Sequence, residues 1–328
     1  MRVLLTGSNG FLGKNLIEVL LQRYPEITIN CLVRRPQESS NPKLNYFHID
    51  YLNKDSLLIS KAFEDINFIF HVAGVTKSAN EKGFIKGNVR PVENLIQTVI
   101  KKHLTLKRFV LVSSQAAGGP AKDLEHYKRE EDPDLPIDAY GRSKKAAEQA
   151  LIDNAGSIPY TIIRPGAVYG PYDVDFFNIF KMAQSHFSIF AGVRNKYVSL
   201  VYSKDLIPAI IDAATTETTI NKTYYICDDH PVTWQEIHDS IFDITGKKKI
   251  DISLPFMPLL FLSYFGSLFS TLTGKATIFN HNKVGFSRPD FWVASNRNAK
   301  KDFNYNSKYN YSEGFRETYQ WYKENDWL

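Results

Sequence analysis

The stretch "VLLTGSNGFLGKNLIEVLL", residues 3–21, decides the fold of this 328-residue chain. It contains a short apolar strand, a glycine turn and an amphipathic helical pattern, in that order. Gly7, Gly10 and Gly13 are spaced by three, so the backbone can turn tightly, approach a pyrophosphate and let the helix pack against a sheet. The amino end of the helix would then face the phosphates. The stretch therefore predicts a dinucleotide-binding site.

The turn departs from the G-x-G-x-x-G fingerprint at one position, where Ser8 takes the place of the second glycine. A glycine turn that serves only helix packing is the alternative interpretation. The strand before the turn and the helix after it favour the dinucleotide site. We expect this site to include Phe11 and Leu12 at the start of the helix.

Apolar β-branched runs alternate with helical patterns through the first half of the chain, which is typical of a parallel sheet covered on both faces. The expected strands are Val3–Thr6, Thr28–Val33, Tyr46–Ile49, Phe68–Val72, Phe109–Ser113 and Thr161–Arg164. We therefore predict an α/β fold, a doubly wound parallel-sheet Rossmann fold with a smaller, helix-rich substrate domain.

The pattern becomes irregular after Arg164, and helical patterns then appear at Thr233–Thr245 and Ser312–Glu324. They indicate a second, smaller portion of the molecule. The expected division gives residues 1–165 to the NAD(P)-binding domain, with 199–226 returning to it, and residues 166–198 and 227–328 to the substrate-binding portion.

The composition is ordinary for a soluble globular enzyme, with 23% charged and 43% hydrophobic residues. The net charge of +5 is mild, and lysine and arginine are spread along the chain, so nucleic acid is not an expected partner. Cys31 and Cys227 lie in β-rich runs, and the amino terminus lacks a signal-peptide pattern. We expect a cytoplasmic protein with a small-molecule substrate, and we keep a homodimer open.

The end of the second strand bears on the choice of dinucleotide, because an acidic residue there reads a ribose 2′-hydroxyl and an arginine accommodates a 2′-phosphate. The sequence is "CLVRRP", residues 31–36, without an acid. Arg34 and Arg35 therefore favour NADP over NAD, since guanidinium groups pair well with phosphate oxygens. Two solvated arginines at a strand exit are the alternative interpretation.

Tyr140 and Lys144 lie four residues apart at the front of a helical pattern, after a charged loop over Gly118–Asp138 that contains three prolines. This spacing places both side chains on one helix face. A nearby cation favours the phenolate and lowers the pKa of a tyrosine. The pair could therefore transfer a proton, although the spacing also occurs by chance on many helices.

Five short motifs occur in one order: "TGSNGFLG" at 6–13, "HVAG" at 71–74, "LVSSQAAGG" at 111–119, "YGRSK" at 140–144 and "RPGAVYGP" at 164–171. With them the chain resembles the extended short-chain dehydrogenase/reductase family over residues 1 to about 230. The remainder, with "PVTWQEIHDSI" and "FWVASNRNAKKDFNY", is similar to 3β-hydroxysteroid dehydrogenase-like and epimerase/dehydratase members.

The resemblance implies three catalytic residues. Tyr140 would be the general acid/base, Lys144 would hold the nicotinamide ribose and lower the pKa of the tyrosine, and Ser114 would hydrogen-bond the substrate oxygen. Ser113 is the rival of Ser114, because family members commonly carry a tyrosine four residues after the active hydroxyl and this chain has Gly118 there.

The resemblance also implies further cofactor contacts. Asp50 would meet the adenine amino group, with Tyr51 or Leu52 beside the ring. Asn88 would support the fourth helix and the active site. The remaining contacts are Val72, Ala73 and Gly74 below the adenine ribose and pyrophosphate, and Pro165 and Val168 beside the nicotinamide. His71 is interpreted as a hydrogen-bonded strand-end histidine, and the run Asp228 to His230 as a solvated turn and no metal site.

Three functions stay open: an NADP-linked oxidoreductase for a secondary alcohol or ketone, a nucleotide-sugar epimerase or dehydratase with bound NAD, and a non-catalytic cofactor sensor. The stretch at residues 254–272 has no charged side chain and approaches the ~20 residues of a membrane span, although its prolines weaken that interpretation. We expect part of it, including Phe261 and Phe265, to line an apolar pocket for a bulky substrate. Packing as core helices is the alternative, and membrane contact is not favoured.

Overall fold

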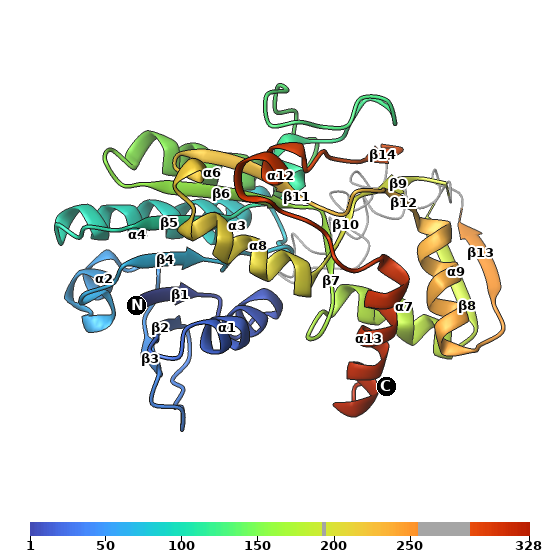
Figure 1. Ribbon diagram of the computed structural model, residues 1–328, viewed down its shortest axis with the longest axis horizontal. Helices are drawn as coiled ribbons and strands as arrows, with labels where there is room; N and C mark the ends of the chain where they lie inside the picture. Colours follow the sequence, from blue (N-terminus) through green and yellow to red (C-terminus); the bar gives the residue numbers. More distant parts are fainter. Residues whose placement is uncertain (192–194, 255–288) are drawn as a thin grey trace.

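A seven-stranded, all-parallel sheet forms the centre of the computed structural model, which describes residues 1–191, 195–254 and 289–328 (Figure 1). The strand order is β11-β6-β5-β4-β1-β2-β3. The strands are β1 (Arg2–Thr6), β2 (Thr28–Val33), β3 (Leu44–His48), β4 (Phe68–His71), β5 (Arg108–Val112), β6 (Tyr160–Pro165) and β11 (Lys222–Ile226).

The strand order explains where a ligand can bind. From β3 through β1 to β6 it reads 3-2-1-4-5-6, the doubly wound order in which the chain direction across the sheet reverses between β1 and β4. Ligands bind in such sheets beyond the carboxyl ends of the strands at this reversal. All five residues of β5 are buried, as is typical of a strand covered on both faces. The predicted α/β fold is confirmed.

Helices cover both faces of the sheet (Figure 1). On one face, α1 (Phe11–Arg23) and α8 (Ser203–Thr215) share an apolar core with the strands. On the other face, α4 (Arg90–Lys101) and α6 (Ala139–Asn154) do the same. The apolar stripe of α4 follows the helical period, so its opposite side is left to solvent.

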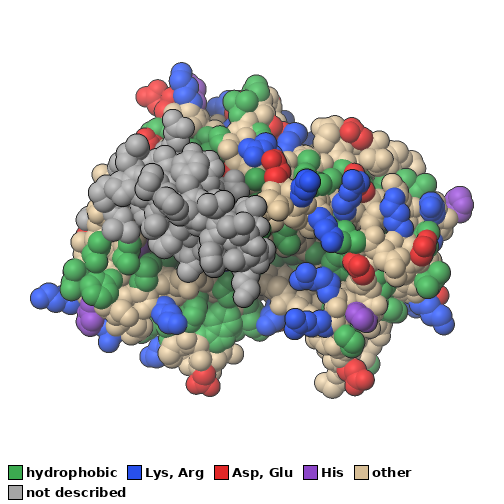
Figure 2. Space-filling model, turned by 180° about the vertical axis from the view of Figure 1, so that it is seen from behind, with side chains coloured by type: hydrophobic (Ala, Val, Ile, Leu, Met, Phe, Trp, Pro, Cys, Tyr) green, Lys and Arg blue, Asp and Glu red, His purple; other side chains and the backbone are tan. Residues whose placement is uncertain are grey.

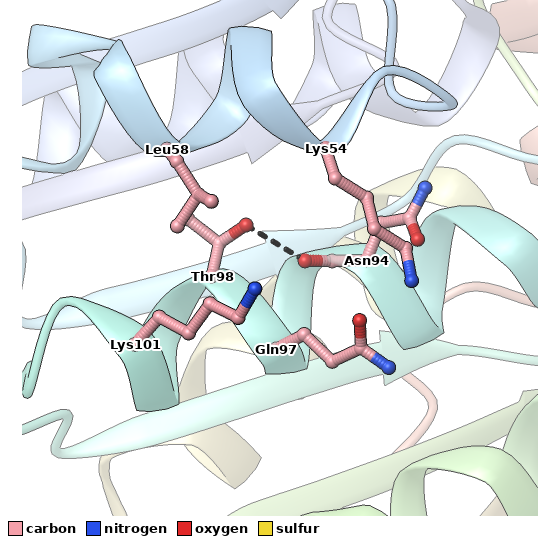
Figure 3. A pocket seen from close by; sticks show the side chains of 6 residues that line it. All are labelled: Lys54, Leu58, Asn94, Gln97, Thr98 and Lys101. Atoms are coloured by element: carbon pink, nitrogen blue, oxygen red, sulfur yellow. Dashed lines mark hydrogen bonds between the residues drawn. The ribbon is translucent and has the colours of Figure 1, made fainter.

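The short helix α2 (Lys54–Ile59) packs beside α4, and Figure 3 shows the polar side chains between them. Lys54 comes from α2 and Lys101 from α4, and the hydroxyl of Thr98 donates to the carbonyl oxygen of Asn94 at 2.8 Å. Asn94 is buried and its Nδ2 donates to the carbonyl oxygen of Tyr51 at 2.7 Å. This bond ties the loop after β3 to α4.

A second group of elements lies beyond one end of the sheet (Figure 1). These elements surround an aromatic core that includes Tyr169, Phe180 and Phe315. The helices of this group are α7 (Asp175–Gln184), α9 (Trp234–Thr245) and α13 (Tyr311–Glu324). Its small sheets pair β7 (Ala167–Tyr169) with β10 (Leu200–Tyr202), β8 (Phe187–Ala191) with β13 (Ile250–Leu254), and β9 (Tyr197–Val198) with β12 (Val232–Thr233) and β14 (Phe291–Trp292).

Local sequence signals fix the starts of two of these helices. Thr233 caps α9, and its side chain and that of Glu236 form a reciprocal capping box. Asn310 and Glu313 form the same motif at α13. The predicted helices therefore agree with the structure to within one residue at each end. The remaining short elements are η1 (Lys61–Phe63), α3 (Glu81–Phe84), η2 (Ile85–Val89), α5 (Gln115–Gly118), η3 (Glu217–Thr219) and α12 (Arg297–Phe303).

Candidate active site

The glycine turn between β1 and α1 is closely packed. Gly7 has φ +78°, and a Cβ there would lie 2.7 Å from the backbone nitrogen of Ala73. A Cβ at Gly13 would lie 2.0 Å from the carbonyl oxygen of Gly7. Gly10 caps α1 without a side-chain hydrogen bond, so the first amides of the helix are not occupied by a cap. Phe11 and Leu12 form the half-buried start of the helix.

Two exposed arginines follow β2 on the same edge of the sheet. Burial raises the pKa of Tyr51, against lowerings by the backbone of Gly7 and, less strongly, by the charge of Arg34. No carboxylate in the described part of the chain forms an ion pair with Arg34 or Arg35. The hydroxyl of Tyr51 donates to the carbonyl oxygen of Leu32 at 2.6 Å. The side chain of the exposed Asp50 accepts a hydrogen bond from the backbone amide of Leu52 at 2.9 Å.

The loop after β4 lies at the same edge of the sheet as the glycine turn. The backbone amide of Ala73 donates to Thr6 Oγ1 at 3.2 Å, which fixes Val72 to Gly74 beside the glycine turn. A Cβ at Gly74 would lie 3.1 Å from Asn88 Oδ1 and 3.4 Å from Lys144 Nζ. A glycine is therefore needed for the loop to approach these two side chains closely.

Asn88 joins this loop to the helix that carries the tyrosine. Its Oδ1 accepts from the amide of Val75 at 2.7 Å, and its Nδ2 donates to Ser143 Oγ at 2.9 Å. Ser143 in turn donates to the carbonyl oxygen of Tyr140 at 2.7 Å. Asn88 lies in η2, a π-helical turn, a feature frequent at functional sites.

Tyr140 and Lys144 lie on the first turns of α6, which Asp138 caps by accepting from the amide of Gly141 at 2.7 Å. Burial raises the pKa of Tyr140 to about 12, against a lowering by the neighbouring Ser114 side chain. Burial lowers the pKa of Lys144 to about 8. The ammonium of Lys144 donates to the carbonyl oxygen of Val112 at 2.8 Å. The expected lowering of the pKa of Tyr140 is therefore not seen in the described structure.

The two serines after β5 have different surroundings. Ser114 caps α5, accepting from the amide of Ala116 at 3.1 Å, and its side chain lies beside that of Tyr140, where it lowers the pKa of the phenol. Ser113 instead donates to Glu148 Oε1 at 2.5 Å and is buried. The geometry thus brings Ser114, not Ser113, to the tyrosine.

Gly118 stands where the family resemblance implies a tyrosine. A Cβ at this position would lie 1.8 Å from the hydroxyl oxygen of Tyr225, which comes from β11. The fully buried Tyr225 accepts from Arg164 at 3.0 Å. A tyrosine from a distant strand therefore fills this space.

Pro165 and Val168 lie at the far side of the site. Pro165 is the buried last residue of β6, paired with Ile226. Val168 is half-buried in β7 and packs against the core that contains α1 and α8. Both residues follow Arg164 at the carboxyl edge of the sheet. Ser114 lies at the same edge, just after the neighbouring strand β5.

His71 is only partly satisfied by hydrogen bonds. Its Nδ1 lies 2.8 Å from Thr6 Oγ1, but its buried Nε2 has no hydrogen-bond partner among the described residues. Burial lowers its pKa to about 3, and the charge of Lys144 acts in the same direction. His71 is therefore a neutral neighbour of Lys144.

Two further expectations concern metals and membranes. Within residues 1–191, 195–254 and 289–328, no cluster of three or more histidine, cysteine or acidic side chains could hold a metal ion. Asp228 is half-buried and accepts from Ser307 at 2.9 Å, so the expected solvated turn is wrong for this residue. None of the helices in the described ranges has the length and apolar character of a membrane span. Phe261, Phe265 and residues 255–272 lie outside the described residues.

The basic side chains on the face that Figure 2 shows do not form one continuous stripe. In Figure 2 lysine and arginine side chains are scattered over one face, with acidic side chains among them. Many of the basic groups form ion pairs, such as Lys77 with Asp175 at 3.0 Å and Arg142 with Glu81 at 2.9 Å.

Residues 4–256 match the 3-beta hydroxysteroid dehydrogenase/isomerase family. The chain belongs to this family. Its assignment to the extended short-chain dehydrogenases/reductases is thereby confirmed, and the protein is an NAD(P)-dependent oxidoreductase of this type.

Comparison with individual proteins shows how far the similarity extends. The chain is 25% identical to ceramide reductase of Caulobacter vibrioides over 333 residues, covering 99% of this chain and 96% of that protein. It is 26% identical to the decarboxylating sterol-4-alpha-carboxylate 3-dehydrogenase of Candida albicans over 289 residues, 80% of each chain. UDP-glucuronic acid 4-epimerase from Bacillus cereus, solved with UDP-glucuronic acid and NAD, has a TM-score of 0.80 at 19% identity, covering 99% of this chain and 100% of that chain. The last likeness shows the shared fold.

Proposed function

We propose that the protein interconverts a secondary alcohol and a ketone on a bulky, apolar small molecule, with Tyr140 as the acid/base. The observation that carries this proposal is the placement of the Ser114 side chain beside the phenol of Tyr140, one helical turn from the buried ammonium of Lys144. Such a set provides a proton donor, a hydroxyl that binds the substrate oxygen, and a cation.

A bound nicotinamide supplies or accepts the hydride. In reduction, Tyr140 gives its proton to the carbonyl oxygen as this oxygen gains charge, and Ser114 holds the oxygen in place. In oxidation, the tyrosine oxygen takes the hydroxyl proton. Because burial raises the pKa of Tyr140 to about 12, the phenol is protonated at neutral pH, which suits the acid role in reduction.

NADP is the proposed cofactor. The support is the exposed Arg34, which follows β2 and forms no ion pair with a described carboxylate. Lys144 would hold the nicotinamide ribose. The other proposed contacts are Gly7, Gly10, Phe11, Leu12, Gly13, Asp50, Tyr51, Val72, Ala73, Gly74, Asn88, Pro165 and Val168.

The substrate class follows from two considerations. Ceramide reductase and the sterol dehydrogenase, to which the chain is similar over most of its length, are named for apolar, lipid-like substrates. We assign substrate binding to residues 166–198 and 227–328, and cofactor binding to residues 1–165 and 199–226. The described part of the substrate-binding residues contributes to an aromatic core, which could form the wall of an apolar pocket.

The test is a turnover assay that follows reduced nicotinamide with NADPH or NADH against sterol-like ketones, long-chain lipid ketones and flavonoid-like ketones. We expect turnover with at least one bulky apolar ketone and a preference for NADPH. The nucleotide retained by the purified protein identifies the cofactor independently.

A nucleotide-sugar epimerase with bound NAD is the second candidate, supported by the fold shared with UDP-glucuronic acid 4-epimerase. Tight, productive binding of a UDP- or GDP-sugar, with no response to apolar alcohols or ketones, would establish this function in place of the first.

A further inference from the structure

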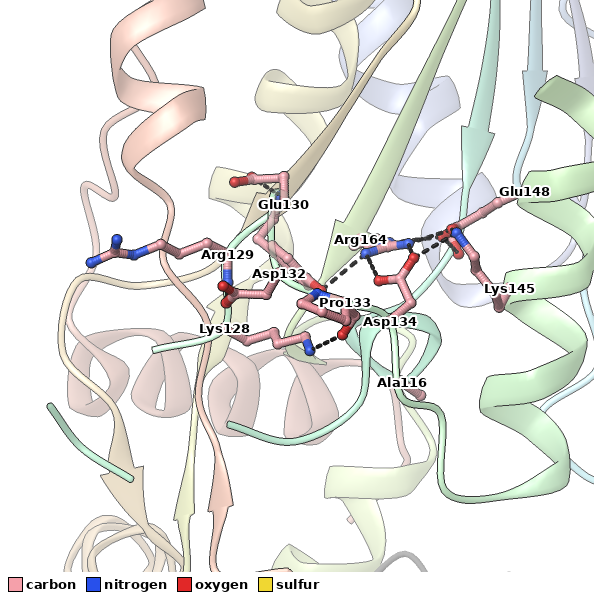
Figure 4. Close-up of polar contacts among 12 residues, drawn as sticks. Ala116, Lys128, Arg129, Glu130, Asp132, Pro133, Asp134, Lys145, Glu148 and Arg164 are labelled. Carbon is pink, nitrogen blue, oxygen red and sulfur yellow. Dashed lines mark hydrogen bonds and ion pairs between the residues drawn. The ribbon is translucent and has the colours of Figure 1, made fainter. Parts of the chain in front are cut away.

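Arg164 is buried between the carboxylates of Asp134 and Glu148 (Figure 4). Its Nη2 lies 2.6 Å from Glu148 Oε2, and its Nη1 lies 2.7 Å from Asp134 Oδ1. The side chains of Arg164 and Glu148 are 3% and 1% exposed. A charge that is buried this deeply destabilises the fold unless an opposite charge pairs with it, as the carboxylates do with Arg164 here.

Glu148 connects the segments that carry the proposed machinery. Its Oε1 accepts from Ser113, the residue before Ser114, at 2.5 Å, and from Arg164 Nε at 2.9 Å. Arg164 directly precedes Pro165 in β6. Glu148 also follows Lys144 by one turn of α6, and both are buried. A single carboxylate thus contacts the residue that follows β5 and a residue of β6, and it shares a helix face with the lysine.

Glu148 lies among three cations: it pairs with Arg164 and, at 3.9 Å, with Lys145, and it follows Lys144 by one helical turn. Lys144 forms no ion pair with any carboxylate among the described residues, and it donates to a backbone carbonyl. Burial lowers the pKa of Lys144, and the charge of Glu148 partly opposes this lowering. The other titratable groups that face Lys144 are Tyr140 on the same helix and the neutral His71 from β4.

We propose that Glu148 is a positioning residue: through Ser113 and Arg164 it fixes the strand ends beside Ser114, and from the turn after Lys144 it provides the counter-charge to that ammonium. The inference rests on the proposed function insofar as Ser114 and Lys144 belong to the active site. It adds a residue that touches neither substrate nor cofactor.

Two variants separate the charge of Glu148 from its shape. Glu148→Gln keeps the length of the side chain and loses the charge, whereas Glu148→Asp keeps the charge and withdraws the carboxylate from Ser113. NMR of ¹³C-labelled lysine in the protein without cofactor reports the protonation of Lys144, assigned by the signal lost in Lys144→Met. We expect the Lys144 transition to move down by about one pH unit in Glu148→Gln and to stay in place in Glu148→Asp. An unmoved transition in Glu148→Gln overturns the counter-charge.

We expect Glu148→Gln to affect cofactor binding and Glu148→Asp to affect turnover. Glu148→Gln should weaken NADP binding at pH 8 more than at pH 6.5, in fluorescence titrations. Glu148→Asp should lower kcat on the order of tenfold or more, with cofactor affinity unchanged. Glu130→Gln is the matched control, because this half-buried glutamate accepts from the amide of Tyr225 and from Asn298, away from Lys144. It should change neither quantity, and a purely structural role would give equal losses in both Glu148 variants.

Failure of the proposal for Glu148 can be distinguished from failure of the proposed function. The NMR transition and the cofactor titration require no substrate, so they decide the counter-charge even if wild-type protein reduces no ketone, a result that would refute only the proposed function. Should Glu148→Gln fail to fold, Ser113→Ala decides, because it removes one hydrogen bond and no charge. A fall in kcat like that of Glu148→Asp supports the proposal, and an unchanged kcat overturns it.

Discussion

The hydroxyl oxygen of Tyr225 lies where a side chain at Gly118 would have to be placed, 1.8 Å from the Cβ position. The two residues are more than a hundred positions apart in the chain, one at the end of α5 and the other in β11. Tyr225 is held there by Arg164, which donates to its hydroxyl at 3.0 Å. The contact couples the segment after Ser114 to the edge strand of the sheet.

This contact predicts that Gly118→Ala destabilises the protein. The buried Tyr225 cannot move away without losing its bond to Arg164, and overpacking of this kind typically costs ~1–3 kcal/mol. Chemical denaturation measures the free energy of unfolding. Tyr225→Phe removes the clashing oxygen, so the double variant should lose less than the sum of the single losses. Strict additivity would contradict the proposed clash.

Tyr140→Phe should retain the fold and cofactor affinity but lose nearly all turnover. The ring still packs against Phe84, at 6.1 Å between centroids, while the transferable proton is gone. Loss of acid/base catalysis typically lowers the rate by ~10²–10⁴. Tyr160→Phe is a matched control, because Tyr160 begins β6 at the opposite end of the strand from Pro165. A fully active Tyr140→Phe enzyme would refute the mechanism.

Cofactor affinity should fall as the pH rises above about 8. Burial lowers the pKa of Lys144 to about 8, so the ammonium predominates below this pH and the neutral amine above it. If the ammonium holds the ribose, affinity should fall by at most about tenfold per pH unit beyond the transition. Fluorescence titrations from pH 6.5 to 9.5 measure this dependence. Lys144→Met should bind weakly at every pH, with no such transition.

Arg34→Asp should reverse the preference for NADP over NAD. The carboxylate repels a 2′-phosphate and accepts bonds from ribose hydroxyls, and loss of one charged hydrogen bond corresponds to about tenfold or more in affinity. Calorimetric titration of both cofactors into wild type and variant gives the ratio. Arg129→Asp, an exposed substitution on the loop before α6, controls for the change in net charge. Equal wild-type affinities for NADP and NAD would exclude this role of Arg34.

Much of the sheet could be predicted because its strands are continuous apolar runs. Six strands agree with their predicted ranges to within two residues. The seventh, β11, was not predicted as a strand, since the short run from Lys222 has an exposed start and no distinct period. Its place beside β6 depends on pairing between residues about 60 positions apart. Local patterns contain no information on such a partner.

In the proposed site, too, local features could be predicted from the sequence and contacts between distant residues could not. The spacing of Tyr140 and Lys144, and the turn at Gly7, are local features that the sequence displays directly. The partners of these residues are not local: Asn88 reaches Ser143 over 55 positions, and Arg164 reaches Asp134 over 30. Buried polar side chains such as Glu148 resemble solvated helix residues in the sequence, so their role becomes visible only in the folded structure.

The π-helical turn at Ile85–Val89 sets the phase of everything that follows it in α4. A wide turn of this kind holds more residues than an α-helical turn, and removal of one residue would rotate the downstream helix by about 100°. Asn88 would then no longer face Val75 and Ser143, or the apolar stripe with Val92 and Leu95 would turn away from the sheet. The length of this turn is therefore as constrained as the identity of any side chain in it, and natural variants should differ here by substitution, not by insertion or deletion.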